Sequence, residues 1–197
     1  MKAKAPALLI VGLLAGMAAP AARAEIGVGL EGGYFVPNDN SFRQLFKEGP
    51  VEGFSIHLRT RQGFGALLFL DYYTATAHLQ GETFKVTAYP VSLQALYYLD
   101  ESPHISPFIA AGISDVMGYE TNVTANKKIG SNKVGLGGSL GAEFGARSWR
   151  VRPYFRFSYM EIPGQSAVQG INLSGYTMVA GATVNFGKPK KPAKPAP

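Results

Sequence analysis

Apolar residues alternate with small or polar residues along most of this chain. The last such stretch shows the pattern most clearly: from Tyr176 to Phe186 every second residue is apolar or aromatic, and the residues between them are mainly small or polar. A period of two residues is typical of β-strands, whose side chains point alternately to the two faces of a sheet. The same pattern predicts eight strands, over residues 25–36, 52–61, 63–78, 84–99, 107–120, 133–146, 149–162 and 173–186.

One face of these predicted strands is apolar, whereas the other is rich in glycine, small polar residues and charges. A soluble sandwich would turn the apolar face inward. A narrow barrel in lipid would turn it outward, and the small residues would then fill an interior with little room. Backbone groups in lipid have no water to bond, so such a sheet must close on itself. We therefore predict an all-β fold, an eight-stranded antiparallel up-and-down transmembrane β-barrel over residues 25–186.

The first 24 residues have the features of a leader that is removed. Lys2 and Lys4 precede a short apolar run at 7–19, and Ala22-Arg23-Ala24 offers the small residues that a signal peptidase needs. The alternative is an N-terminal membrane anchor, but the run is shorter than the ~20 residues that a membrane helix requires. The sequence predicts a cleaved signal peptide at 1–24 and export across the inner membrane.

Charge is concentrated at the two ends of the chain. Seven of the 19 Lys and Arg residues lie in the leader or after Phe186, which leaves 12 against 13 acidic residues in between. The central part has no basic stripe, so we expect no nucleic-acid partner. Residues 187–197 are rich in Lys and Pro, and proline favours an extended chain without a core. They predict a disordered periplasmic tail, either simply solvated or in contact with the cell wall.

Connections and aromatic residues predict the orientation in the membrane. Connections near 62–63, 100–106 and 147–148 are mostly short, whereas those at 37–51, 79–83, 121–132 and 163–172 are mostly longer. Short turns are typical of the periplasmic side, which would make both termini periplasmic. Two bands of outward aromatic residues should mark the membrane interfaces: Phe64, Tyr97, Phe144, Trp149 and Phe186 near the short turns, and Tyr34, Tyr72, Tyr159 and Tyr176 near the loops.

Six charged residues on the inward face form the main candidate site. Counting up from the short turns puts three of them low in the barrel and three near mid-height: Arg59, Glu143 and Arg152 below, and Glu31, Asp71 and Arg156 above. A buried charge without a partner is costly, so acids and arginines should pair. We expect a salt-bridged lumen that does not conduct; the alternative is a gated ion path.

Two stretches carry a resemblance to a known family. The segment from Tyr176 to Phe186 resembles the terminal sorting signal of bacterial outer-membrane barrels. Residues 33–50, with Gly33-Tyr34-Phe35-Val36-Pro37-Asn38-Asp39, Phe42, Phe46 and Gly49-Pro50, resemble the first hairpin of small OmpA/OmpX-like barrels. The resemblance implies a structural or surface-interaction role in the outer membrane. It also implies contact with membrane lipid and lipopolysaccharide, and with the barrel-assembly machinery and periplasmic chaperones. Phe186 departs from the pattern because 11 residues follow it.

Two other functions stay open. One is a narrow, porin-like channel for small or hydrophobic solutes, as in OmpW-like barrels; an apolar upper lumen with a lateral opening would favour it. The other is a lipid A-modifying enzyme, since His104-Ile105-Ser106 matches a His-x-Ser pair. That triplet falls in a predicted periplasmic turn without an obvious glutamate neighbour. We expect no enzyme, no cofactor and no metal, because His57, His78 and His104 lack a metal-binding spacing.

Local features add three expectations. Ser41 is a candidate N-cap for a short helix whose Phe42, Leu45 and Phe46 form either a lid on the barrel rim or a surface for a partner. In the predicted loop at 121–132, Lys127 and Lys128 offer contact with lipopolysaccharide, or are simply solvated. Pro90, which lacks a backbone donor, predicts a bulge or an irregularity within its strand.

Overall fold

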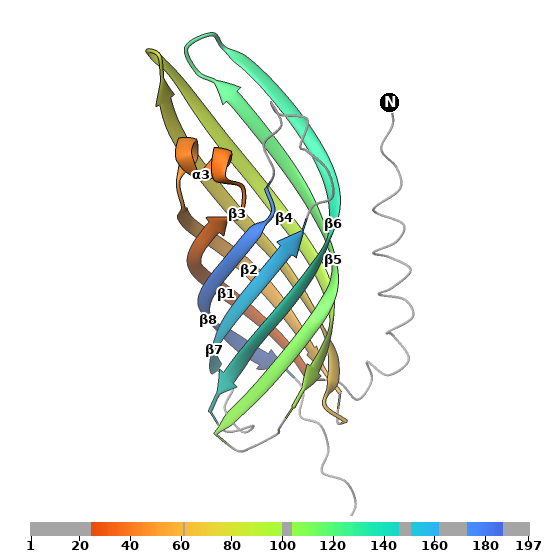
Figure 1. The fold of residues 1–197 in the computed structure, drawn as a ribbon. Coiled ribbons are helices and arrows are strands. Elements are labelled where there is room, and N and C mark those ends of the chain that lie inside the picture. The colour runs from red at the N-terminus through yellow and green to blue at the C-terminus, as the bar shows by residue number, and fades with distance from the viewer. Residues whose placement is uncertain (1–24, 61, 100–103, 146–150, 162–172, 187–197) are drawn as a thin grey trace, which may run out of the picture.

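The structure is a computed structural model that describes residues 25–60, 62–99, 104–145, 151–161 and 173–186. Eight strands form a closed barrel in which each pairs antiparallel with the next and β8 pairs with β1 (Figure 1). The strands are β1 (Glu25–Pro37), β2 (Gly49–Arg59), β3 (Phe64–Leu79), β4 (Glu82–Tyr98), β5 (Ile105–Asn122), β6 (Lys127–Phe144), β7 (Val151–Glu161) and β8 (Gly175–Phe186). The predicted fold class, an eight-stranded antiparallel up-and-down barrel, is confirmed.

The outer face of the barrel is apolar. Leu30 and Leu136 are 73% and 70% exposed, and Leu140 and Val184 also face outward. In a soluble sandwich these side chains would be buried, so that alternative is wrong. An apolar outer face around a polar interior is the arrangement of barrels that lie in lipid. Among the described residues, no helix is long and apolar enough to cross a membrane.

The barrel wall is higher on one side than on the other. Strands β3 to β6 rise beyond their neighbours, as Figure 1 shows. Strand β6 pairs with β7 only from Leu136 to Glu143, and the ladder between β2 and β3 ends at Val51 and Tyr73. Two hairpins, β3–β4 and β5–β6, therefore form a tall part of the wall.

Two predicted loops are tight turns instead. The ladder between β5 and β6 continues to Asn122 and Lys127, so the loop expected at 121–132 shrinks to residues 123–126. Lys127 and Lys128 consequently belong to β6. The loop expected at 79–83 is a turn at Gln80 and Gly81, both with positive φ (50° and 82°). Two such residues suit the twist of a two-residue hairpin. The top of the β5–β6 hairpin is mostly polar, with Val123 and Ile129 as exposed exceptions, so its alternation was too weak to reveal it.

Pro90 interrupts the ladder between β3 and β4 without creating a bulge. Leu70 pairs with Val91 on one side of the interruption and Tyr73 pairs with Ala88 on the other, so the strand register is the same on both sides. The two pairs between them are missing, opposite Pro90. Its lack of an N–H group is the physical reason, and this is the irregularity that the sequence predicted.

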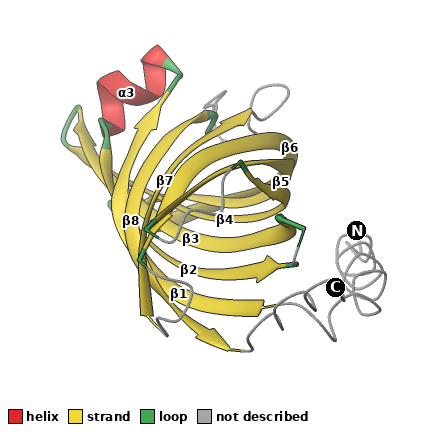
Figure 2. Cartoon of the chain, turned by 90° about the horizontal axis from the view of Figure 1, so that it is seen from below, coloured by secondary structure: helices red, strands yellow, loops and turns green. Residues whose placement is uncertain are grey.

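The helix α3 (Asn40–Phe46) lies at the barrel rim, as Figure 2 shows. Its N-cap is Asp39, not Ser41: the Asp39 carboxylate accepts from the backbone N–H groups of residues 41 and 42 at 2.7 and 3.1 Å. The cap prediction was therefore wrong by two residues. Phe42 and Phe46 are buried against the cluster that includes Tyr73, whereas Leu45 is 38% exposed. The helix thus packs on the rim as a lid would.

Candidate functional site

A lower layer of charges crosses the lumen near the short-turn end and is centred on Glu143 of β6. The Glu143 carboxylate lies 3.3 Å from Arg152 of β7 and 3.7 Å from Arg59 of β2. His57 Nδ1 lies 3.0 Å from its other oxygen, which also accepts from the Tyr98 hydroxyl at 2.5 Å. All five side chains are buried. The layer therefore joins four strands, β2, β4, β6 and β7, through one carboxylate.

Two members of the lower layer were missed by the sequence analysis. Glu25, the first residue of β1, pairs with Arg152 at 2.6 Å and is buried. Tyr98 lies under the Arg59 guanidinium, 3.8 Å from Cζ to the ring centroid. Glu25 lies an even number of residues before Glu31 on the same strand, so the alternation already indicated that its side chain points inward. Nothing in the alternation marks Tyr98 as a hydrogen-bond donor.

The middle layer is centred on Arg156 of β7, which is fully buried. Its guanidinium pairs with Glu31 of β1, lies 3.5 Å from Asp71 of β3 and donates to Ser158 Oγ at 2.6 Å. The Tyr154 hydroxyl also donates to Glu31. The planar guanidinium can serve several acceptors at once, which suits a position between two carboxylates. The structure thus brings together Glu31, Asp71 and Arg156 at one level.

One glycine makes the close approach of the two acids possible. A Cβ on Gly53 would lie 2.3 Å from Asp71 Oδ1 and 3.2 Å from the Glu31 Cγ atom. No side chain fits there without moving both acids. Phe69 closes the layer from another side, because its ring lies 3.7 Å from the Arg156 Cζ atom. Such a cation–π contact favours the charged guanidinium.

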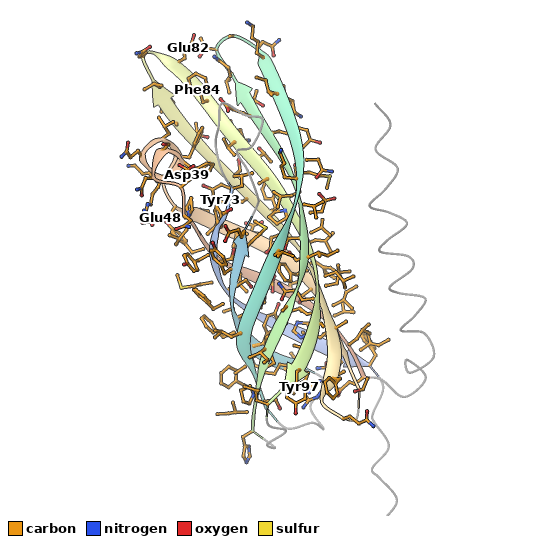
Figure 3. All side chains as sticks on the ribbon, turned by 45° about the vertical axis from the view of Figure 1, so that its right-hand side comes forward. Asp39, Glu48, Tyr73, Glu82, Phe84 and Tyr97 are labelled. Carbon is orange, nitrogen blue, oxygen red and sulfur yellow. The ribbon has the colours of Figure 1, made fainter. Side chains whose placement is uncertain are left out.

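Above the two layers the lumen holds a small pocket. Its walls are largely apolar, with Phe35, Val51, Tyr73 and Val116 among them. Figure 3 shows Tyr73 near the upper rim and Tyr97 near the opposite end of the barrel. The pocket floor is polar and includes Asp71 of the middle layer. The lower lumen is not wholly charged, because Leu67, Leu96 and Phe108 belong to a second buried apolar cluster beside the charge layers.

Of the aromatic residues predicted to mark the interfaces, the structure describes all except Trp149, which lies outside the described residues. The rings form pairs on the outer face. Phe64 and Tyr97 have centroids 4.8 Å apart near the short turns, and Tyr159 and Tyr176 lie 4.9 Å apart near the loops. Exposed side chains include Tyr34, Phe64, Tyr72, Tyr97, Phe144, Tyr176 and Phe186, and the analysis missed Tyr89, which pairs with Tyr72 at 5.4 Å.

The two residues of the enzyme hypothesis, His104 and Ser106, differ in their surroundings. His104 is exposed at the short-turn end, whereas Ser106 is buried. We expected no glutamate at this level, and that was wrong: Ser106 pairs in register with Glu143. The Glu143 carboxylate, however, already bonds His57 and Tyr98. No three His, Asp or Glu residues in the described part of the chain are placed to hold a metal ion.

Three predictions concern residues that the structure does not describe. The signal peptide at 1–24, the tail at 187–197 and the loop at 163–172 lie outside the described ranges. Both ends of the described barrel nevertheless meet, because Ile26 of β1 pairs with Phe186 of β8.

Comparison with known proteins supports the fold. No family model and no curated protein sequence matches the chain. Among solved structures, OprG of Pseudomonas aeruginosa is 13% identical with a TM-score of 0.64, covering 83% of this chain and 95% of that one. Neisserial surface protein A is 17% identical with a TM-score of 0.56, covering 83% and 97%. The N-terminal barrel of P. aeruginosa OprF is 14% identical with a TM-score of 0.52, covering 83% and 98%.

This chain has the fold of the small outer-membrane β-barrels. The suspected resemblance is thereby confirmed at the level of fold. At these identities the comparison concerns architecture, and function must be argued from the lumen and the surfaces of this chain.

Proposed function

We propose that this protein is an outer-membrane barrel with a structural or surface-interaction role, whose lumen is closed to ions. The observation that carries this proposal is the pair of charge layers. Arg156 extends from β7 to acids on β1 and β3, and Glu143 is bonded from three other strands. Buried ion pairs with several hydrogen bonds resist opening, because separating them leaves uncompensated charges.

The outer surface supports a place in the outer membrane. An apolar band flanked by aromatic side chains is what a lipid bilayer with two interfaces requires. Strand β1 begins and strand β8 ends at the short-turn end of the barrel. Both termini would then lie in the periplasm after removal of the leader. Tyr176 and Phe186, both outward on β8, would form the sorting signal that the barrel-assembly machinery recognises, after delivery by periplasmic chaperones.

The tall hairpins support contact with the anionic surface of the outer leaflet. Lys127 and Lys128 lie at the start of β6, and Lys128 Nζ lies 4.2 Å from the centroid of the Tyr119 ring. Phosphate groups of lipopolysaccharide would suit such lysines. Ail of Yersinia pestis, 10% identical with a TM-score of 0.52, has been solved in complex with the heparin analogue sucrose octasulfate. The tail would add contact with the cell wall.

Planar-bilayer recording tests the closed lumen. The full chain, refolded in detergent and checked for a heat-dependent shift in electrophoresis, should show no steady open state at neutral pH. A general porin inserted in the same bilayer is the positive control. A steady large conductance from correctly folded protein would contradict the closed lumen, whereas failure to fractionate with outer membranes would contradict the proposed location.

A second candidate is uptake of small hydrophobic solutes, and two observations favour it. The upper lumen is an apolar pocket, and the β3–β4 ladder lacks two pairs beside Pro90, which lines that pocket. A solute could leave the pocket sideways into lipid at this position. Uptake of an apolar fluorescent solute by cells should then fall when Pro90→Ala allows the ladder to close. A lipid A-modifying activity has no such support, and mass spectrometry of lipid A with and without the protein would test it.

A further inference from the structure

The floor of the upper pocket combines unused hydrogen-bonding capacity with one more carboxyl group than guanidinium group. The floor is formed by five polar side chains, and most of their atoms have partners: Ser92 and Ser114 bond each other at 2.6 Å, and Gln94 Oε1 accepts from Ser139 at 2.7 Å. The apolar walls rise directly above this floor. The site is thus built for a molecule with an apolar body and a polar end.

Two buried polar atoms of the floor have no hydrogen-bond partner among the described residues: Asp71 Oδ1, an acceptor, and Gln94 Nε2, a donor. Asp71 is 5% exposed and Gln94 is 1% exposed, so bulk water does not solvate them. Gly53, next to Asp71 Oδ1, has no side chain to cover that oxygen. An unpaired polar group in such a place destabilises the protein, and a ligand that bonds it would remove that cost.

The charges of the lumen show which ligand the floor favours. In the lower layer, Arg59 and Arg152 face Glu143 and Glu25, so two positive charges meet two negative charges. In the middle layer Arg156 alone faces both Glu31 and Asp71. The middle layer therefore has one more carboxylate than guanidinium, and Asp71 belongs both to that layer and to the pocket.

We propose that the upper pocket binds a small apolar amine, with the protonated amino group bonded to Asp71 Oδ1 and the apolar body against Val51, Tyr73 and Val116. The ammonium group adds a second positive charge to a layer in which one guanidinium faces two carboxyl groups, and a charge-assisted hydrogen bond is stronger than a neutral one. Gln94 Nε2 offers a second bond to an oxygen atom of the ligand. An anionic ligand is disfavoured, because its charge would face Asp71 and Glu31.

This inference goes beyond the closed barrel, since it concerns binding and holds whether or not the ligand crosses the membrane. The probes are 2-phenylethylamine, its neutral analogue 2-phenylethanol and the anion phenylacetate. Calorimetric titration into the full chain in lipid nanodiscs, corrected with empty nanodiscs, should give affinities in the order amine, alcohol, anion. The conductance experiment can fail without affecting this result, and the reverse is also true.

Asp71→Asn should weaken the binding of 2-phenylethylamine about tenfold or more and leave the affinity for 2-phenylethanol unchanged. The tenfold loss corresponds to about 1.4 kcal/mol of binding free energy, for the charged ligand alone. The matched control is Glu52→Gln, which removes one carboxylate from the exposed outer face of the neighbouring strand β2. It should leave both affinities unchanged. The heat-dependent electrophoretic shift verifies that each variant folds.

Two results would overturn the proposal. One is equal affinity of the unmodified protein for 2-phenylethylamine and 2-phenylethanol, or tighter binding of phenylacetate. The other is an amine affinity that folded Asp71→Asn leaves unchanged. If Asp71→Asn does not fold, the order of the three probes on the unmodified protein still decides, and Ala88→Leu, which narrows the pocket wall, should weaken the amine and the alcohol together.

Discussion

Replacing Arg156 with methionine should lower the free energy of unfolding by about 3–5 kcal/mol, the usual cost of removing one partner from a buried ion pair. Methionine is unbranched and replaces the aliphatic part of the arginine side chain, but the contact of the guanidinium with the Phe69 ring is lost. The loss comes from Glu31 and Asp71, two buried carboxyl groups that lose their shared guanidinium. The hydrogen bond to Ser158, 2.6 Å long, is lost as well.

The assay is urea unfolding of the barrel in lipid vesicles, followed by the fraction of protein that runs at the folded position in unheated electrophoresis. Arg43→Met is the matched control, because Arg43 lies on α3 and bonds only Asn40, in an exposed pair. That change should stay within about 0.5 kcal/mol.

A neutral triple variant tests the electrostatic cause directly. Adding Glu31→Gln and Asp71→Asn to Arg156→Met removes all three charges, and uncharged side chains of similar size often replace a buried ion cluster at little cost. Most of the lost stability should return. The reasoning is refuted if Arg156→Met is no more harmful than Arg43→Met, or if the triple variant is less stable than Arg156→Met alone.

Two further predictions concern the lid helix and the close packing of strands. Phe42→Ala should release α3 and speed tryptic cleavage at Lys47, because a buried phenylalanine contributes about 3–5 kcal/mol to the free energy of unfolding. Leu45→Ala, at an exposed position, should leave the cleavage rate unchanged. Equal cleavage rates for the two variants would show that Phe42 does not hold α3 in place. Gly33→Ala should abolish the folded band in unheated electrophoresis, since its Cβ would lie 1.9 Å from a backbone carbonyl oxygen of β8. Gly32→Ala should fold normally, because its Cβ would lie 4.0 Å from the nearest atom, the Val51 carbonyl oxygen. A folded Gly33→Ala barrel would contradict the close approach of β1 and β8 at this position.

Strand periodicity made much of the interior predictable. In an antiparallel barrel, parity fixes which residues face inward, and the distance from a turn fixes their height. Counting from the short turns was therefore enough to place Arg156 at the level of Glu31 and Asp71. The register between β1 and β2 was not needed for this, because each count began at the same end of the barrel.

Other parts of the molecule lacked a signal of this kind. The top of the β5–β6 hairpin, with Lys127, Lys128 and Asn132, is mostly polar, and the exposed Ile129 is not enough to give an alternation that marks it as strand. The N-cap of α3 was placed at Ser41 on residue type, yet Asp39 also has a suitable side chain, and only backbone geometry distinguishes them. Tyr98 and Glu25 join the lower layer through contacts between strands far apart in sequence.

The weak alternation of the third to fifth strands has a physical cause that bears on function. In upper β4 and β5, the inward Val86, Ala88 and Val116 are as apolar as the outward Tyr89 and Met117. Both faces are apolar there because lipid lies on one side and the upper pocket on the other. At mid-height in the same strands Ser92, Gln94 and Ser114 face inward, and below them Leu96, Phe108 and Ala110 form part of a second buried apolar cluster. A barrel strand that loses its period-two pattern without losing its length therefore indicates apolar side chains inside as well as outside, and here a polar level that includes Asp71 lies between an upper and a lower apolar cluster.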